Sequence, residues 1–306
     1  MNRRDFIKKT LKLSVTAGAA AAFGNIENLI AAPVKKGVKP DLAAVQGGSA
    51  PEMFRKGIQE LGGIKAFVKK GQSVVVKPNI GWDAPPERGA NTNPELVEEI
   101  VKQAYEAGAR RVYVFDHTCD HWRSCYENSG IQEAVRRAKG IMVPAHERRN
   151  YKKVDVPGGK SIKTAEVHEL ILDSDVFINV PVLKTHGSTR LTIGMKNLMG
   201  IIWSRRTWHI SGLNEKIAEF TAYRKPDLTV VDAYRVMIKN GPRGVSVDDV
   251  ELMKYQVLAK DIVAADAASA KIFGMDPKTV RHIAYAHELG IGSMDLEKMK
   301  IKRIKI

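Results

Sequence analysis

Short apolar runs alternate with amphipathic stretches along most of the chain. Runs rich in branched apolar residues lie at positions 41–45, 73–77, 111–115, 175–180, 227–231 and 255–258. Apolar residues recur with helical spacing over positions 51–70, 93–105, 217–223, 262–273 and 277–288. Continuous apolar runs joined by helical crossovers are typical of buried parallel strands. The pattern therefore predicts an α/β fold, with a mostly parallel or mixed sheet and helices on both faces, in three layers.

The first 32 residues have the layout of an export signal. Arg3 and Arg4 precede an apolar stretch over residues 11–23 that is rich in Ala and Gly, and two alanines at 31–32 offer a cleavage point. This order is typical of a bacterial twin-arginine signal. The stretch falls well short of the ~20 strongly apolar residues of a stable membrane span. We expect a cleaved leader over residues 1–32, export to the periplasm and one domain over 33–306; a basic N-terminal helix of a cytoplasmic protein is the alternative.

Composition and charge narrow the function classes. The 306 residues include 49 Lys+Arg and 34 Asp+Glu, which gives a net charge of +15, and the balance of residue types is that of a globular protein. The two cysteines, Cys119 and Cys125, exclude an intrinsic four-cysteine iron–sulfur cluster and a cysteine-only zinc site. The positive charge indicates a partner, a substrate or a location, and composition alone does not distinguish among these three. A nucleic acid is not expected for an exported protein.

Polar residues follow the first of the longer apolar runs. In open α/β sheets, ligands bind beyond the carboxyl ends of the strands. Lys77 and Asn79 follow the run at 73–76 and form a donor pair suited to an anionic or carbonyl oxygen. The alternative for Lys77 is a surface lysine beside a turn.

A denser group of donors follows the run at 175–180. Lys184, Thr185 and His186 come first, and Lys196 and Asn197 open the next predicted helix. Ammonium groups, hydroxyls and glycine amides at this density favour binding of an oxyanion or phosphate. The glycine spacing of a Walker loop is absent. We expect these residues to bind a small anion, with His186 as an acid or base.

Three aspartates come after later apolar runs. Asp232 follows the run at 227–231, and Asp261 and Asp266 flank the start of a predicted helix. Such carboxylates hold a cation, orient a lysine or act as a base. Asp232 and Asp261 are candidate catalytic residues, although Asp261 fits a helix N-cap equally well and Asp266 fits a structural ion pair.

The segment after the run at 111–115 is rich in metal-ligand types. His117, Cys119, His121 and Cys125 would suit zinc or another divalent metal, although their spacing matches no known finger. A disulfide between the two cysteines and two free thiols remain alternatives, with a Cys-His nucleophile as a further one.

A basic and aromatic run occupies residues 203–209. Its Trp203, Arg205, Arg206, Trp208 and His209 would suit stacking on bases or gripping a phosphate. In an exported protein we expect instead a lid or rim over the anion pocket, or plain surface packing.

Several segments together resemble one bacterial and archaeal family, domain of unknown function 362. The matching segments lie at residues 74–80, 91–94, 107–109, 175–186, 195–200, 227–232, 241–242 and 259–266. The resemblance implies a shared fold and pocket, and some members carry an appended ferredoxin-type module that this chain lacks. The motif positions it implies here are Lys77, Asn79, Lys184, Thr185, His186, Lys196, Asn197, Asp232, Asp261 and Asp266.

Two functional hypotheses follow from these residues. The first is an exported enzyme that binds a small anionic substrate or cofactor, with His186, Asp232 and Asp261 in catalytic roles. The alternative is a non-catalytic accessory protein that handles a metal or associates with an iron–sulfur redox partner. A third hypothesis, a nucleic-acid binder, rests on charge alone.

Overall fold

The computed structural model describes residues 24, 26, 29 and 39–306. The predicted export signal over residues 1–32 therefore lies, apart from three isolated residues, outside the described part of the chain. Within that part, every helix is too short or too polar to cross a lipid bilayer.

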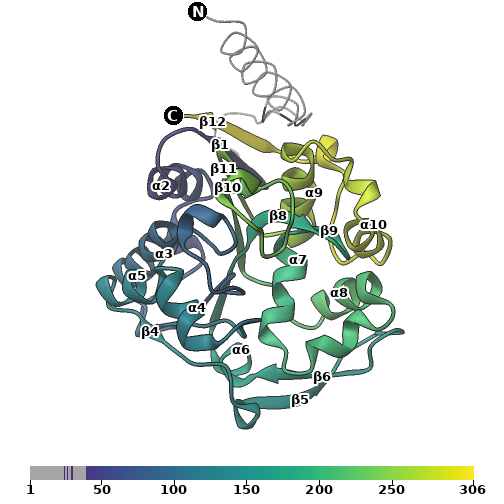
Figure 1. The fold of residues 1–306 in the computed structure, drawn as a ribbon. Coiled ribbons are helices and arrows are strands. Elements are labelled where there is room, and N and C mark those ends of the chain that lie inside the picture. Colours follow the sequence, from purple (N-terminus) through teal and green to yellow (C-terminus); the bar gives the residue numbers. More distant parts are fainter. Residues whose placement is uncertain (1–23, 25, 27–28, 30–38) are drawn as a thin grey trace, which may run out of the picture.

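The structure confirms a three-layer α/β fold built on a mixed sheet (Figure 1). The order β12-β1-β11-β10-β7-β2-β3-β4 runs across the sheet, and β8 pairs with both β10 and β9. A separate hairpin pairs β5 with β6. The strands are β1 (Leu42–Gln46), β2 (Ser73–Pro78), β3 (Arg111–Val114), β4 (Ile141–Met142), β5 (Tyr151–Asp155), β6 (Thr164–His168), β7 (Val176–Val180), β8 (Val182–His186), β9 (Arg190–Thr192), β10 (Leu228–Met237), β11 (Val250–Ala259) and β12 (Ile301–Lys305).

Helices cover both faces of this sheet (Figure 1). The described helices are α2 (Ala50–Glu60), α3 (Pro94–Glu106), α4 (Trp122–Asn128), α5 (Ile131–Arg137), α6 (Glu169–Asp173), α7 (Gly194–Asn197), α8 (Leu213–Thr221), α9 (Ile262–Ile272) and α10 (Arg281–Glu288). Helices α2, α3 and α5 pack on one face, and α7, α8, α9 and α10 lie on the other (Figure 1).

The central strands are buried on both faces, as their continuous apolar runs predict. Strands β4, β3, β2 and β7 are parallel in the order β4-β3-β2-β7, and β7 is parallel to β10. Because side chains alternate along a strand, Val74 and Val76 of β2 join the core under α2 and α3, whereas Val75 faces the opposite core.

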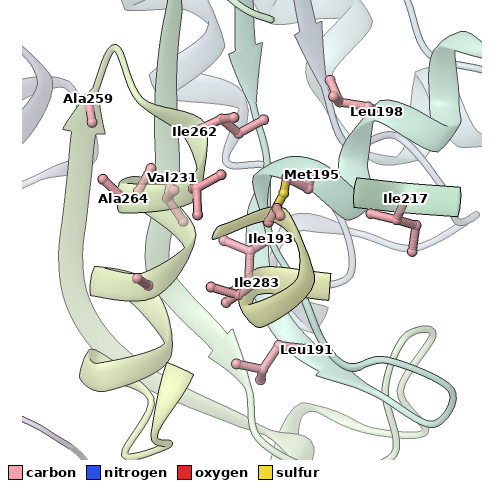
Figure 2. Close-up of a cluster of buried hydrophobic side chains, with 14 of the residues drawn as sticks. Leu191, Ile193, Met195, Leu198, Ile217, Val231, Ala259, Ile262, Ala264 and Ile283 are labelled. Atoms are coloured by element: carbon pink, nitrogen blue, oxygen red, sulfur yellow. The ribbon is translucent and has the colours of Figure 1, made fainter. Parts of the chain in front are cut away.

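The second core lies between the sheet and the helices α7, α8, α9 and α10. Figure 2 shows Ile193 and Met195, at the start of α7, packed among side chains of α9, α8 and α10, including Ile262, Ile217 and Ile283. These residues are 0–1% exposed. The packing fixes the position of α7 against β7 and α9.

Local sequence signals account for the helix ends. The Asn93 side chain accepts hydrogen bonds from the amides of Glu95 and Leu96 and so caps α3, with Pro94 in its first turn. The helix predicted over 51–70 is too long, because α2 ends at Glu60 before Gly62 and Gly63, whose φ angles are 100° and 76°. Such angles favour glycine and end the helix.

Two other expectations about local structure are wrong. The segment after β7 is a strand, because β8 begins at Val182 and pairs with the second half of β10 and with β9. Strand β10 continues five residues beyond Asp232, so that residue lies within a strand and not at its end.

Candidate functional site

A cavity of about 310 Å³ is formed by the ends of β2 and β8, the loop after β3, and α7 with the segments that follow it. This is the position at which open α/β sheets bind ligands. The cavity is lined by Lys77, Asn79, Gly81, Trp82, Asp116, His117, Cys119, Lys184, His186, Thr192, Lys196, Asn197, Met199, Gly200, Arg205, His209 and Pro242.

Lys77 is not a surface lysine but a fully buried one, at the end of β2. Its Nζ lies 2.8 Å from Asp116 Oδ1, and it donates to Asn197 Oδ1 and to the Pro78 carbonyl at 2.8 Å each. Burial lowers the pKa of Lys77, and the neighbouring carboxylate of Asp116 opposes that shift. Asp116 Oδ2 accepts a hydrogen bond from the Ile80 amide at 2.7 Å, which fixes the carboxylate in place.

Gly200 makes room for this ion pair. A Cβ at this position would lie 2.6 Å from Lys77 Nζ and closer still to Asp116 Oδ1. Real Cβ atoms essentially never approach other atoms within 3.0 Å. Gly200, in the segment 195–200, therefore allows the backbone to pack closely against the Lys77–Asp116 pair.

An amide network fixes the floor of the cavity. Asn197 Oδ1 accepts from Asn79 Nδ2 at 3.0 Å, as well as from Lys77, and Asn197 Nδ2 donates to Asn179 Oδ1 at 2.9 Å. Asn79 Oδ1 in turn accepts from Lys184 Nζ at 3.2 Å. The predicted binding residues on β2, β8 and α7 are thus joined by direct hydrogen bonds.

Lys184 and Lys196 are the two lysines of the cavity that no carboxylate pairs. The Lys184 ammonium also donates to the Ala90 carbonyl, and burial lowers its pKa to about 7. Lys196 Nζ donates to Met199 Sδ at 3.2 Å. Burial, and then the charge of Arg205, lower the pKa of Lys196 to about 8.

The histidines of the cavity are neutral at pH 7. Burial and the charges of Lys196 and Lys184 lower the pKa of His186 to about 3. Partial burial and the charge of Lys196 also lower the pKa of His209, whose ring centroid lies 6.2 Å from that of His186. Neutral rings add no positive charge to the cavity, and each has one nitrogen that donates and one that accepts a hydrogen bond.

Arg205 joins the segment 203–209 to the loop after β3. Its guanidinium donates to the carbonyl of His117 and, at 2.6 Å, to that of Thr118, and one nitrogen lies 3.4 Å from Cys119 Sγ. Arg205 and His209 line the cavity, which agrees with the rim predicted from the basic and aromatic run.

Asp266 places α7 without reaching the cavity. This buried carboxylate accepts hydrogen bonds from the amides of Gly194 and Met195 at 2.7 and 3.0 Å. Burial raises the pKa of Asp266 to about 7, and the two amides oppose that shift. Asp266 thereby positions Lys196 and Asn197, which follow on the same helix.

The two aspartates predicted to be catalytic do not line the cavity. Asp232 Oδ2 accepts from the Asn93 amide at 2.7 Å, where α3 begins, and burial raises its pKa to about 6. Asp261 caps α9 by accepting from the Val263 amide at 2.8 Å, which is the structural alternative considered for it. In the described structure both carboxylates accept backbone hydrogen bonds outside the cavity lining.

Thr185 is also not among the residues that line the cavity. Its Oγ1 accepts a hydrogen bond from the Gly241 amide at 3.1 Å. This contact holds the segment that carries Pro242, which lines the cavity.

The predicted metal ligands do not gather around one point. Among the described residues, no group of three or more His, Cys, Asp or Glu side chains is close enough to hold a metal ion. Cys119 and Cys125 are free thiols, and Cys125 is buried with a pKa raised to about 12 by burial. His121 is exposed at the start of α4, whereas His117 stacks on Trp203 with ring centroids 5.1 Å apart.

Sequence reasoning missed two residues that form the site. Asp116 lies two residues after β3, so the strand-end rule could have identified it, but only the histidines and cysteines that follow it were considered as ligands. Gly200 carries no side-chain signal of its own, and only the close approach of the Lys77–Asp116 pair explains it.

The fold and cavity define an α/β protein with a lysine-rich site at the ends of its strands. The chain belongs to the family described as "Domain of unknown function (DUF362)", which matches over residues 74–271. This confirms the resemblance identified from the sequence motifs.

Known proteins include similar chains. The thylakoid-associated protein sll1697 of Synechocystis sp. is 27% identical over 260 residues, which are 80% of this chain and 77% of that protein. A protein from Thermotoga maritima is similar in structure, with 13% identity, a TM-score of 0.43 and coverage of 79% of this chain and 59% of its own. Lactate racemase apoprotein from Thermoanaerobacterium thermosaccharolyticum is also similar in structure, with 13% identity and a TM-score of 0.40. The similarity covers 65% of this chain and 51% of that protein. The chain spans just over half the length of these two solved proteins.

Proposed function

We propose that this protein is an exported enzyme that binds a small organic anion in the cavity lined by Lys184, Lys196 and Arg205. The observation that carries the proposal is the charge of the cavity wall. Asp116 is the single carboxylate among the described lining residues, and Lys77 pairs with it. The remaining cations have no acidic partner among the lining residues, so an incoming anion would supply it.

The shape of the cavity limits the size of that anion. A volume of about 310 Å³ lies at the low end of the range for small-molecule pockets. Trp82 and Met199 add apolar surface to the lining beside the cations. These features suit a compact carboxylate or phosphate compound with a short carbon skeleton.

The acid and base of such an enzyme would be an imidazole. His186 replaces the aspartates in our proposal, because Asp232 and Asp261 accept backbone hydrogen bonds away from the cavity. A neutral His186 lies beside His209 in the cavity and would relay a proton between that ring and a bound substrate. Export by the twin-arginine route remains part of the proposal and rests on the sequence of residues 1–32.

The test is retention of a ligand by the mildly purified protein. Native mass spectrometry would show the mass of a bound small molecule, and the molecule released by denaturation would be identified by its own mass. Lys184→Met and Lys196→Met should each lose it, whereas Lys278→Met, at an exposed lysine outside the cavity, should keep it. Equal retention by all variants would refute the assignment of the cavity.

A further inference from the structure

Lys196 differs from the other two lysines of the cavity in its partners. Lys77 is held by three oxygen acceptors, and Lys184 is held by Asn79 and Ala90. Among the described residues, the hydrogen-bond partner of Lys196 Nζ is the thioether of Met199. A thioether is a weak acceptor, so it neither fixes nor stabilises an ammonium ion.

The surroundings of Lys196 make it easier for its ammonium group to lose a proton. Burial is the largest cause of its lowered pKa, and the charges of Arg205 and Lys77 act in the same direction, whereas Cys119 opposes them. Lysines activated for covalent catalysis have this environment, a partly desolvated position beside other cations. A pKa lowered to about 8 brings the unprotonated, nucleophilic amine of Lys196 within reach near neutral pH.

Proton carriers lie near the same amine. The charge of Lys196 lowers the pKa of His186 and His209 in addition to burial, which places both rings within electrostatic range of Nζ. Both rings line the cavity. Neutral imidazoles next to an amine supply the proton transfers that addition to a carbonyl group requires.

We propose that Lys196 is a nucleophile that forms an imine with the carbonyl carbon of a small 2-oxo acid bound in the cavity. The inference rests on the proposed function and names its substrate class. Arg205 and Lys184 hold the carboxylate of such a compound, which leaves its neighbouring carbonyl group to Lys196.

The reaction balances without a further reactant. The neutral Nζ adds to the carbonyl carbon, and a proton moves from nitrogen to oxygen to give a carbinolamine. A neutral histidine ring then takes the remaining proton from the nitrogen and passes it to the hydroxyl group, the C–O bond breaks, water leaves and a C=N bond forms. The ring is neutral before and after this relay.

Reductive trapping tests this step. The full chain is incubated with cyanoborohydride and either pyruvate or 2-oxoglutarate, and peptide mass mapping then locates the reduced adduct. We expect a stoichiometric adduct on Lys196, formed at least tenfold faster than on any other lysine. Acetone, which lacks the carboxylate, should give no such preference, and acetate should slow trapping by competing for the cations.

Two variants separate chemistry from charge and folding. Lys196→Arg keeps a cation but loses the nucleophile, so it should still bind the 2-oxo acid by calorimetry and form no adduct at position 196. The matched control, Lys278→Arg, should be trapped like the unaltered protein. Thermal unfolding followed by circular dichroism shows that each variant is folded.

The outcomes separate the two proposals. Binding of pyruvate or 2-oxoglutarate without selective trapping would overturn the role of Lys196 and leave the anion site intact. The absence of calorimetric binding of both compounds would overturn the 2-oxo acid as substrate and the imine with it, whereas the anion site itself is tested by the ligand-retention experiment. If the Lys196→Arg variant still forms an adduct as fast as the unaltered protein, at another lysine, then Lys196 is not the nucleophile.

Discussion

Gly200→Ala is the substitution that most sharply tests how the cavity is built. The new Cβ would lie 2.6 Å from Lys77 Nζ, which is about 0.8 Å short of an ordinary 3.4 Å contact, and closer still to Asp116 Oδ1. Both partners are at most 3% exposed, so neither can swing into solvent. The backbone of Gly200 is outside the left-handed region, so the substitution adds a steric clash and no conformational strain.

The expected cost follows from two effects. Overpacking of a rigid interior costs about 1–3 kcal/mol. Separation of a buried ion pair costs about 3–5 kcal/mol when one charge is left without its partner. Because the pair can partly relax, we expect Gly200→Ala to lower the free energy of unfolding by about 2–4 kcal/mol.

Urea denaturation followed by circular dichroism measures this loss. The matched control is Gly187→Ala, because Gly187 is exposed, also lies outside the left-handed region, and a Cβ there has no described heavy atom within 4 Å. That variant should stay within about 0.5 kcal/mol of the unaltered protein. If Gly200→Ala is as stable as the control, then Gly200 does not pack closely against the Lys77–Asp116 pair, and this part of the account is refuted.

Three further predictions concern single residues. His282 is fully buried with both ring nitrogens unpaired among the described residues, and burial lowers its pKa to about 3. The unfolded state binds a proton at this histidine below pH 6.5 and the folded state does not, so the free energy of unfolding falls as the pH falls. Between pH 8 and pH 5, urea denaturation should show that the unaltered protein loses about 2 kcal/mol more of this free energy than His282→Leu does. Equal losses in the two proteins would contradict the lowered pKa of His282. Arg205→Ala should weaken calorimetric binding of pyruvate by about tenfold to a hundredfold, as expected for a charged hydrogen bond, and an unchanged affinity would remove Arg205 from the site. Under native conditions the exposed Cys119 should react with a chromogenic disulfide reagent whereas the buried Cys125, whose pKa is raised to about 12, should not; two thiols that react at once, or none, would contradict the structure.

The sequence predicts the layers of this fold well because they depend on local periodicity. The apolar runs at 73–77, 111–115 and 175–180 correspond to β2, β3 and β7, and Asn93 caps α3 as its residue type indicates. Strand β8 was missed because Lys184 and Thr185 make it look polar. It is a strand because β10 and β9 pair with it, and such pairing is a tertiary effect.

The candidate site was predicted in part for a similar reason. Lys77, Asn79, Lys184, Lys196 and Asn197 follow the strand-end rule, and the structure joins them in one cavity. The rule fails for Asp232, because β10 continues beyond it and its carboxylate accepts the Asn93 amide. Residue type alone does not distinguish a carboxylate that binds a ligand from one that binds the backbone.

The most direct test of the account is the content of the cavity in a crystal grown from bromide-containing solution. Anomalous scattering measured at the bromine edge locates each bound bromide without assuming what the natural ligand is. The account predicts a bromide ion, or a copurified organic anion, between Lys196 and Arg205. A cavity that holds only water while bromide occupies other parts of the surface would contradict the claim that this site binds anions.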